Sequence, residues 1–289
     1  MVTTVEHVLN TQNDLGEGPV WKREEGALYW IDINPGCVHK YIPASATHIQ
    51  FDLIPPVGCL ALRTDGSFIV ARERTIEAWS STTGLGEVMA GFELTDVGQR
   101  FNDGAVDPQG RFWVGTIAER NAGFLYRLDS DRSVHRMKTG VGIGNGIGWS
   151  PDHRLMYFTD SARSTIFVYD FDPETGAIAN ERVFDTVTAP GEGVPDGLTV
   201  DCEGTIWSAR WDGWKIVRYT PSGSIAAEIR LPVQRPTSCA FGGEKLDVLY
   251  ITSARTELEP AQLQLQPLAG DLFCLQTDTQ GCVEPRFIG

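Results

Sequence analysis

The sequence contains none of the short motifs that usually mark a nucleophilic or nucleotide-dependent enzyme. It has no Gly-x-Ser-x-Gly segment, no His-Glu-x-x-His segment and no Gly-x-x-x-x-Gly-Lys-Ser/Thr segment. These absences argue against a serine hydrolase of the nucleophile-elbow type, a two-histidine zinc protease and a phosphate-binding-loop protein. The five histidines are scattered, and none belongs to a visible Ser/His/Asp set.

Basic residues are scarce as well. Lys and Arg total 24 against 38 Asp and Glu, which gives a formal net charge of −14. Such an acidic chain is a poor candidate for binding nucleic acid or an anionic membrane surface. No apolar run approaches the roughly 18–20 residues that cross a bilayer, and residues 1–10 lack the basic start and apolar run of a signal peptide. We therefore expect a cytoplasmic monomer with no nucleic-acid or membrane partner.

Cysteines are few for the length of the chain. There are six, and no Cys-x-x-Cys spacing occurs among them. This pattern does not suggest a disulfide framework, so we expect all six to be reduced. Cys59 and Cys239 fall at the same point of the repeat described next, in a strand where a small buried residue is wanted.

A repeated unit accounts for most of the sequence. Its clearest copy, residues 100–116, has a polar residue and a glycine, a short apolar segment, a turn rich in Asp, Pro and Gly, and an aromatic strand. Six copies have their first positions at 17, 58, 102, 145, 196 and 237, with spacings of 41, 44, 43, 51 and 41 residues. A period of about 40–50 residues indicates a propeller or a solenoid.

The runs inside each copy favour the propeller. The aromatic run is followed by a third apolar run in every copy and by a fourth in most. These runs are short, rich in β-branched and aromatic residues, and bounded by turn formers, as strands are. No window has an apolar stripe of helical period and length. The sequence therefore predicts an all-β, six-bladed β-propeller with four antiparallel strands per blade, formed as one domain by residues 1–289.

Four segments fall outside the repeat. Residues 5–9 look like an outer strand that completes the last blade, and residues 283–288 compete for the same place. The longest spacing leaves room for an ordered Pro/Gly-rich loop at residues 188–195. Residues 256–270 form a second insertion, which we expect to cover one end of the ring.

The first position of each repeat lies just before the innermost strand, so six side chains should surround the central channel. They are Glu17, Gly58, Asn102, Asn145, Asp196 and Thr237. Four of them end in a carboxylate or an amide oxygen. Carboxylates that converge in a narrow channel repel each other unless a cation lies between them. With no His or Cys, the set favours Ca²⁺ first and Mg²⁺ or Mn²⁺ next, and it leaves Zn²⁺ and Fe²⁺ open.

An alternative explanation is that these residues only form turns, because Asp and Asn before glycine are routine turn formers. Glu17 fits that explanation less well, since Glu is a poor turn residue. The shared register of the set across the repeats therefore favours a metal site.

Several segments resemble the signature of the SMP-30/gluconolactonase/regucalcin family. They are residues 15–21 (LGEGPVW), 100–104 (RFNDG), 144–146 (GNG) with 149–152 (WSPD), and 195–197 (PDG). The similarity covers essentially the whole chain in order, and its motifs together are highly specific. It implies a six-bladed propeller with one divalent metal in the channel and hydrolysis of sugar lactones.

The resemblance also implies roles for individual residues. Glu17, Asn145 and Asp196 would be the metal ligands, three of the four oxygen-bearing residues that the repeat selects. Arg100 with Asn102 would contact the substrate, and Asp103 would support them. The glutamate that reaches the substrate in the family would correspond to Glu119, in the segment after Gly115-Thr116.

The predicted reaction opens an aldono-lactone, such as gluconolactone, arabinonolactone, xylonolactone or galactonolactone, to its aldonic acid. The metal would act as a Lewis acid, and the attacking water would come from the metal or be activated by Asp196 as a general base. Two alternatives remain: an organophosphate or aryl-ester hydrolase on the same scaffold, and a non-enzymatic propeller that binds a partner or buffers Ca²⁺.

Overall fold

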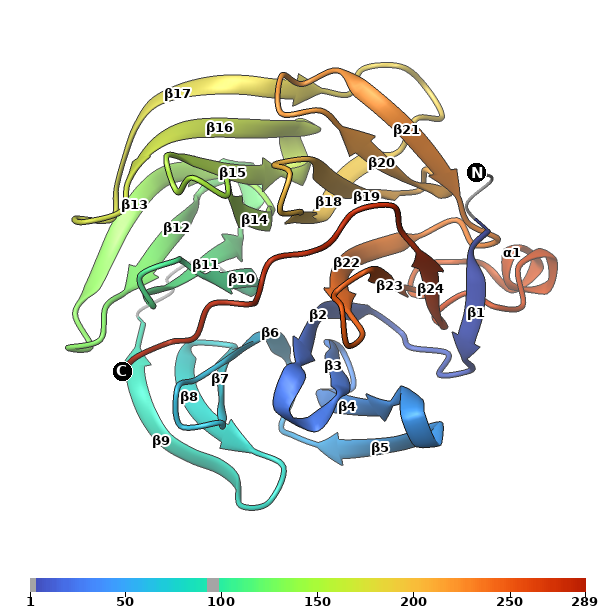
Figure 1. Ribbon diagram of the computed structural model, residues 1–289, viewed down its shortest axis with the longest axis horizontal. Helices are drawn as coiled ribbons and strands as arrows, with labels where there is room; N and C mark the ends of the chain where they lie inside the picture. Colours follow the sequence, from blue (N-terminus) through green and yellow to red (C-terminus); the bar gives the residue numbers. More distant parts are fainter. Residues whose placement is uncertain (1–3, 93–98) are drawn as a thin grey trace.

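The computed structural model describes residues 4–92 and 99–289 and contains six four-stranded antiparallel sheets arranged in a ring (Figure 1). The predicted six-bladed propeller is therefore confirmed. Blades 1 to 3 consist of β2 (Gly16–Lys22), β3 (Ala27–Asp32), β4 (Cys37–Ile42), β5 (Thr47–Asp52); β6 (Val57–Leu62), β7 (Phe68–Arg72), β8 (Thr75–Ser80), β9 (Gly84–Gly91); and β10 (Arg100–Val106), β11 (Phe112–Ile117), β12 (Gly123–Leu128), β13 (Val134–Val141).

Blades 4 and 5 follow the same order along the chain, and blade 6 combines both ends of it. The strands are β14 (Gly144–Trp149), β15 (Leu155–Asp160), β16 (Thr165–Asp172), β17 (Ala177–Thr186); β18 (Val194–Val200), β19 (Ile206–Trp211), β20 (Lys215–Tyr219), β21 (Ile225–Arg230); and β22 (Pro236–Gly242), β23 (Val248–Ser253), β24 (Leu272–Gln276), β1 (Glu6–Leu9). In each blade the first of these strands is innermost, lining the channel.

The N-terminal strand completes the last blade. β1 pairs antiparallel with β24, with Glu6 opposite Cys274 and Leu9 opposite Leu272. This pairing covers an edge that blade 6 would otherwise expose, and it settles the competition between the two ends of the chain in favour of the N-terminal segment.

The C-terminal residues take a different path. Residues 280–289, which we call the C-terminal strap, run across the end of the ring from blade 6 toward blades 2 and 3 (Figure 1). At the far end of the strap, the Phe287 N–H donates to the Leu62 carbonyl at 2.8 Å and the Ile288 N–H donates to the Gly110 carbonyl at 3.2 Å. The strap therefore ties together blades that lie on opposite sides of the ring.

The two insertions are ordered. The loop before Asp196 spans residues 187–193, and β18 begins directly after it. The second insertion contains the short helix α1 (Pro260–Leu265), which the apolar pattern does not predict because none of its residues is buried. A capping box between Glu259 and Gln262 starts this helix. Among the described residues, no helix is both long and apolar enough to cross a membrane.

Packing between blades keeps the innermost strands in place. The second strands are the most buried; all six residues of β3, for example, are buried. Neighbouring blades stack aromatic side chains across their interface, as Trp21 of blade 1 does on Tyr250 of blade 6 with ring centres 5.8 Å apart. Because the blades pack face to face, side chains on the six innermost strands meet at the axis.

Candidate active site

Each innermost strand is irregular at the position that the repeat marks. The pairing register shifts between Glu17 and Val20 in blade 1, and equivalent shifts occur near Gly58, Asn102, Asn145, Asp196 and Thr237 in the other five blades. Such bulges turn a side chain away from the regular alternation of a strand. The prediction that these residues precede the strands is therefore wrong: they lie inside them, at the bulge.

Two of the six positions supply no free oxygen to the channel. A Cβ atom on Gly58 would lie 2.6 Å from the Phe101 carbonyl oxygen, so the close approach of blades 2 and 3 requires glycine there. The Thr237 hydroxyl donates to the Gly16 carbonyl at 2.5 Å, and this bond holds blade 6 against blade 1. Both positions serve the closure of the ring.

The amide side chains of blades 3 and 4 are joined by hydrogen bonds. Arg100 Nη1 donates to Asn102 Oδ1 at 2.9 Å, and Asn102 Nδ2 donates to Asn145 Oδ1 at 2.8 Å. Asn145 Nδ2 then donates to the Ser161 hydroxyl at 2.8 Å, which itself donates to the Pro195 carbonyl at 2.6 Å. This chain of bonds reaches the residue before Asp196 and fixes the amide groups against blade 5.

Three carboxylates from three blades interact electrostatically beside these amides. Burial raises the pKa of Glu17 well above its ordinary range, and the charges of Asp196 and Asp103 raise it further. Burial and then the charge of Asp103 raise the pKa of Asp196 in the same direction, and burial raises the pKa of Asp103 to about 6. The Gly18 N–H, 2.9 Å from Glu17 Oε2, opposes the shift at Glu17 without cancelling it.

A divalent cation fits this arrangement. Glu17, Asn145 and Asp196 are only 5–6% exposed and present oxygen atoms, without nitrogen or sulfur ligands. Buried carboxylates that repel one another are stabilised when a positive charge lies among them. Oxygen donors of this kind suit hard cations such as Ca²⁺.

The remaining predicted residue lies on the rim. Glu119 is exposed and starts the short 3₁₀ turn Glu119–Asn121, which follows β11. Since Arg100 pairs with Ile117, this turn lies at the same end of the channel as Arg100. The structure thus brings Glu17, Asn102, Asp103, Asn145 and Asp196 together with Arg100 and leaves Glu119 at their periphery.

A second cluster of potential ligands lies where the repeat did not indicate one. Within residues 4–92 and 99–289, one group of three His, Cys, Asp or Glu side chains has its ligand atoms all within 4.8 Å of one another: Asp32, Cys37 and His39, buried in blade 1. The Asp32 carboxylate already accepts hydrogen bonds from the Asp14 and Leu15 N–H groups, at 2.9 and 2.8 Å. The Cys-x-His spacing on one strand was the available signal, because alternate residues of a strand share a face.

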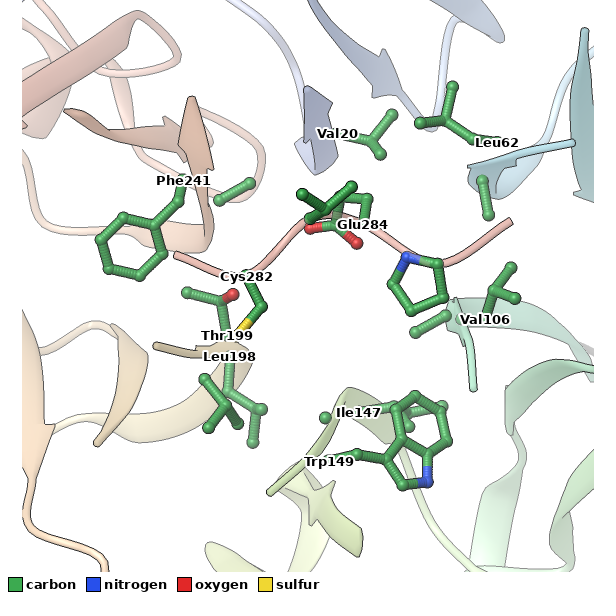
Figure 2. A pocket seen from close by; sticks show the side chains of 18 of the residues that line it. Val20, Leu62, Val106, Ile147, Trp149, Leu198, Thr199, Phe241, Cys282 and Glu284 are labelled. Atoms are coloured by element: carbon green, nitrogen blue, oxygen red, sulfur yellow. The ribbon is translucent and has the colours of Figure 1, made fainter. Parts of the chain in front are cut away.

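The other end of the channel contains a cavity of about 590 Å³. Figure 2 shows its apolar walls, with Val20, Leu62, Val106 and Trp149 surrounding the strap that carries Cys282 and Glu284. Asp103 also lines this cavity, whereas Glu17, Asn145 and Asp196 do not. The cavity therefore lies behind the cluster of oxygen ligands, and the strap crosses its outer side.

Comparison with known families and proteins adds independent information. A family model described as SMP-30/Gluconolactonase/LRE-like region matches residues 15–255. A 6-deoxy-6-sulfogluconolactonase from Pseudomonas putida is 37% identical over 292 residues, covering 100% of both chains. A pentonolactonase from Haloferax volcanii is 40% identical over 261 residues, which is 87% of this chain and 85% of that protein.

Solved structures agree with these similarities. The crystal structure of a calcium-binding protein, regucalcin, from Agrobacterium tumefaciens matches with a TM-score of 0.94 at 29% identity, covering 99% of this chain and 97% of that one. Fold and sequence similarity therefore extend over the same, nearly complete length of the chain.

Proposed function

This chain belongs to the SMP-30/gluconolactonase/LRE-like family, and we propose that it is a metal-dependent hydrolase that opens a sugar lactone to its aldonic acid. Two relatives are named for the hydrolysis of hexonic and pentonic lactones. The proposed substrate class is therefore an aldono-1,4- or 1,5-lactone with several hydroxyl groups. The proposed cofactor is one divalent cation, with Ca²⁺ first and Mg²⁺, Mn²⁺, Zn²⁺ or Fe²⁺ as the alternatives.

The observation that carries the proposal is the meeting of oxygen-bearing side chains from separate blades. Glu17 and Asp196 are more than 170 positions apart in the sequence, yet the charge of Asp196 raises the pKa of Glu17. Burial raises the pKa of both carboxylates, so both positions would be easier to bury as neutral residues. A cation site explains why this costly arrangement exists.

The proposed ligands are Glu17, Asn145 and Asp196. When bound, the cation would supply positive charge to the lactone oxygens and to the charge that develops on the carbonyl oxygen during attack. The hydrogen bond from Asn102 fixes the orientation of the Asn145 amide. Support of this kind for a ligand typically matters by about 10–100-fold in affinity or activity.

Asp196 is the proposed general base, because the chain of hydrogen bonds from Arg100 ends at the residue before it and its charge is the one that raises the pKa of Glu17 most. It would accept a proton from the water that attacks the lactone carbonyl. Arg100, which donates to Asn102 Oδ1 and to the Phe101 carbonyl, would hold substrate hydroxyls together with Asn102. Asp103 would act through its charge on Glu17 and Asp196, and Glu119 would approach the substrate from the rim.

The test is a metal-replacement experiment. The protein is stripped with a chelator, single divalent metals are added back, and acid release is followed for a panel of pentonic and hexonic lactones, an aryl ester and a phosphotriester. We expect metal-dependent turnover of at least one aldono-lactone and its loss in Asp196→Asn. Turnover of the ester or the phosphotriester with no lactone faster than the uncatalysed reaction would replace this proposal with the rival hydrolase. Metal binding without turnover of any substrate would support a calcium-binding protein.

A further inference from the structure

Two cysteines that are far apart in the sequence lie side by side at the end of the ring that the strap crosses. The Sγ atoms of Cys202 and Cys282 are 2.7 Å apart, although 80 positions separate the two residues in the chain. Both residues are exposed and neither is bonded in the structure. Cys202 lies in the turn between β18 and β19, and Cys282 lies near the start of the C-terminal strap.

The backbone on both sides holds the two sulfurs in place independently of their contact. The Cys202 N–H donates to the Gln280 carbonyl at 2.9 Å, and Asp201 forms an antiparallel bridge with Gly281. The Gly281 N–H donates to the Leu246 carbonyl at 2.8 Å. Little conformational entropy remains to be lost when two groups are already positioned in this way.

Close packing fixes the strap further. A Cβ atom on Gly281 would lie 2.2 Å from the Phe241 Cβ atom, so glycine is required for the strap to lie this close to blade 6. On the other side, the Asp201 carboxylate accepts hydrogen bonds from the Glu203 and Thr205 N–H groups at 3.0 and 2.8 Å, which makes the turn that carries Cys202 rigid. The backbones that carry the two cysteines cannot separate without breaking these contacts.

The other cysteines do not compete for the same chemistry. Cys37, Cys59 and Cys239 are buried, and Cys274 is half-buried on β24. A buried thiol is inaccessible to an external oxidant and reacts poorly. Cys202 and Cys282 are thus the pair that an external oxidant can reach.

The strap, which contains Cys282, lies along the outer side of the cavity at the far end of the channel. Cys282, Val283, Glu284 and Pro285 all line that cavity (Figure 2). The opposite end of the strap is fastened by backbone bonds of Phe287, which is fully buried. At its start, the strap is held on blade 5 by the bridge at Gly281, by the bond from the Cys202 N–H to the Gln280 carbonyl and by the contact between the two sulfurs.

We propose that Cys202 and Cys282 are an oxidation site, at which a small-molecule disulfide converts the two thiols to a disulfide bond that fastens the C-terminal strap across the channel end. In the first step a Cys202 thiolate attacks the external disulfide, forms a mixed disulfide and releases one small thiol. In the second step the Cys282 sulfur attacks the mixed disulfide at the Cys202 sulfur and releases the second small thiol. Two protein thiols are oxidised, and one external disulfide is reduced to two thiols.

The experiment equilibrates the full-length protein in glutathione buffers of increasing oxidised-to-reduced ratio. After denaturation and blocking of free thiols, we expect four of the six thiols to titrate in the oxidised protein and all six in the reduced protein. Intact mass should fall by about two mass units, one for each lost thiol hydrogen. Peptide mapping without reductant should recover the Cys202 peptide joined to the Cys282 peptide. A cross-link that closes an 80-residue loop should also raise Tm by roughly 5–10 °C.

Serine variants separate this proposal from general oxidation. Cys202→Ser and Cys282→Ser should each abolish the mass loss and the rise in Tm, whereas Cys274→Ser should retain both. The proposal is overturned if the oxidised protein carries glutathione without losing two thiols, if the mapped cross-link joins any other pair, or if Cys202→Ser keeps the rise in Tm. Because the wild-type protein is measured with and without oxidant, the outcome does not depend on how well the variants fold.

Discussion

Asn102 Nδ2 donates a hydrogen bond to Asn145 Oδ1 at 2.8 Å, and this bond joins blade 3 to blade 4 at the channel wall. The same nitrogen donates to the Gly144 carbonyl at 3.0 Å, while Asn102 Oδ1 accepts from Arg100. Both polar atoms of the Asn102 side chain therefore have partners. The arrangement leaves Asn145 with one defined orientation of its amide.

Replacing Asn102 by Ala should impair catalysis more than folding. The Asn145 oxygen loses the donor that orients it, and Arg100 loses an acceptor. We expect kcat/KM for the preferred lactone to fall by about 10–100-fold, the range seen when support for a metal ligand is removed. Acid release in the presence of saturating metal measures the effect.

Asn180→Ala is the matched control for this change. Asn180 lies on the outer strand β17 and donates to Asp170 Oδ2 at 2.7 Å on the exposed surface, so its loss should leave kcat/KM within twofold of the wild-type value, as is usual for surface substitutions. Equal losses in the two variants would remove the argument for a role of Asn102 in the channel.

Asp196→Asn should abolish turnover and yet stabilise the metal-free protein. Burial and the charge of Asp103 raise the pKa of Asp196, which means that its charged form is unfavourable in the fold without a cation. The neutral amide removes this repulsion at nearly constant volume. With a chelator present at about pH 8, we expect Tm to rise by about 2–4 °C, equivalent to roughly 1 kcal/mol.

Added Ca²⁺ provides the second half of that measurement. It should raise the Tm of the wild-type protein, because a ligand that binds only the folded state stabilises that state. The Tm of Asp196→Asn should stay unchanged, because this variant lacks one of the proposed ligands. Asp170→Asn, at an exposed residue paired with Arg182, should behave like the wild type in both conditions. A metal-free Asp196→Asn protein that is less stable than the wild type would mean that the carboxylate has a structural partner.

The repeated turn after the innermost strand makes a separate prediction about stability. The Asp107 carboxylate is fully buried and accepts from the Gln109 and Arg111 N–H groups and from Trp113 Nε1, at 2.9, 3.0 and 3.0 Å. Asp107→Asn should cost about 2–4 kcal/mol of unfolding free energy in urea, since it leaves buried donors without an acceptor. Asp65→Asn, in the exposed turn of blade 2, should cost less than about 0.5 kcal/mol.

The fold was predictable because the sequence pattern of one blade repeats along the chain. A spacing of about 43 residues recurs whenever four short strands and their turns make one blade, and the turn that begins at Asp107 reappears at Asp201 with the same bonds to a following tryptophan. The position of three residues on the channel was predictable for the same reason: Asn102, Asn145 and Asp196. They occupy one register of a repeat, and that register lies on the channel.

What the sequence could not supply depends on contacts between distant backbones. Beside the bulge at Asp196, two innermost strands approach so closely that a Cβ on Gly197 would lie 2.2 Å from Ser238 Oγ. The path of the strap depends on Phe287 bonding to Leu62, more than 220 positions earlier. Neither contact has a local pattern in the sequence.

The strap should also make the stability of the protein depend on pH. Burial raises the pKa of Glu284 to about 7, compared with about 4.3 for an ordinary glutamate in an unfolded chain. The folded state therefore binds this proton more tightly than the unfolded state. The protonated Glu284 carboxyl contributes this stability in full when the pH is below the pKa of the unfolded chain. The contribution is lost as the pH rises through the pKa of about 7 in the folded protein.

Glu284→Gln should remove this dependence, because Gln is uncharged at every pH. Between about pH 5 and pH 8, the Tm of the variant minus that of the wild type should become more positive by about 2–4 °C, roughly 1 kcal/mol, a value reduced because Glu284 is partly exposed. Glu244→Gln, at an exposed site outside the cavity, should show a difference that does not vary with pH. A constant difference for Glu284→Gln as well would place its carboxylate in solvent and would mean that the strap does not shield the end of the channel from water.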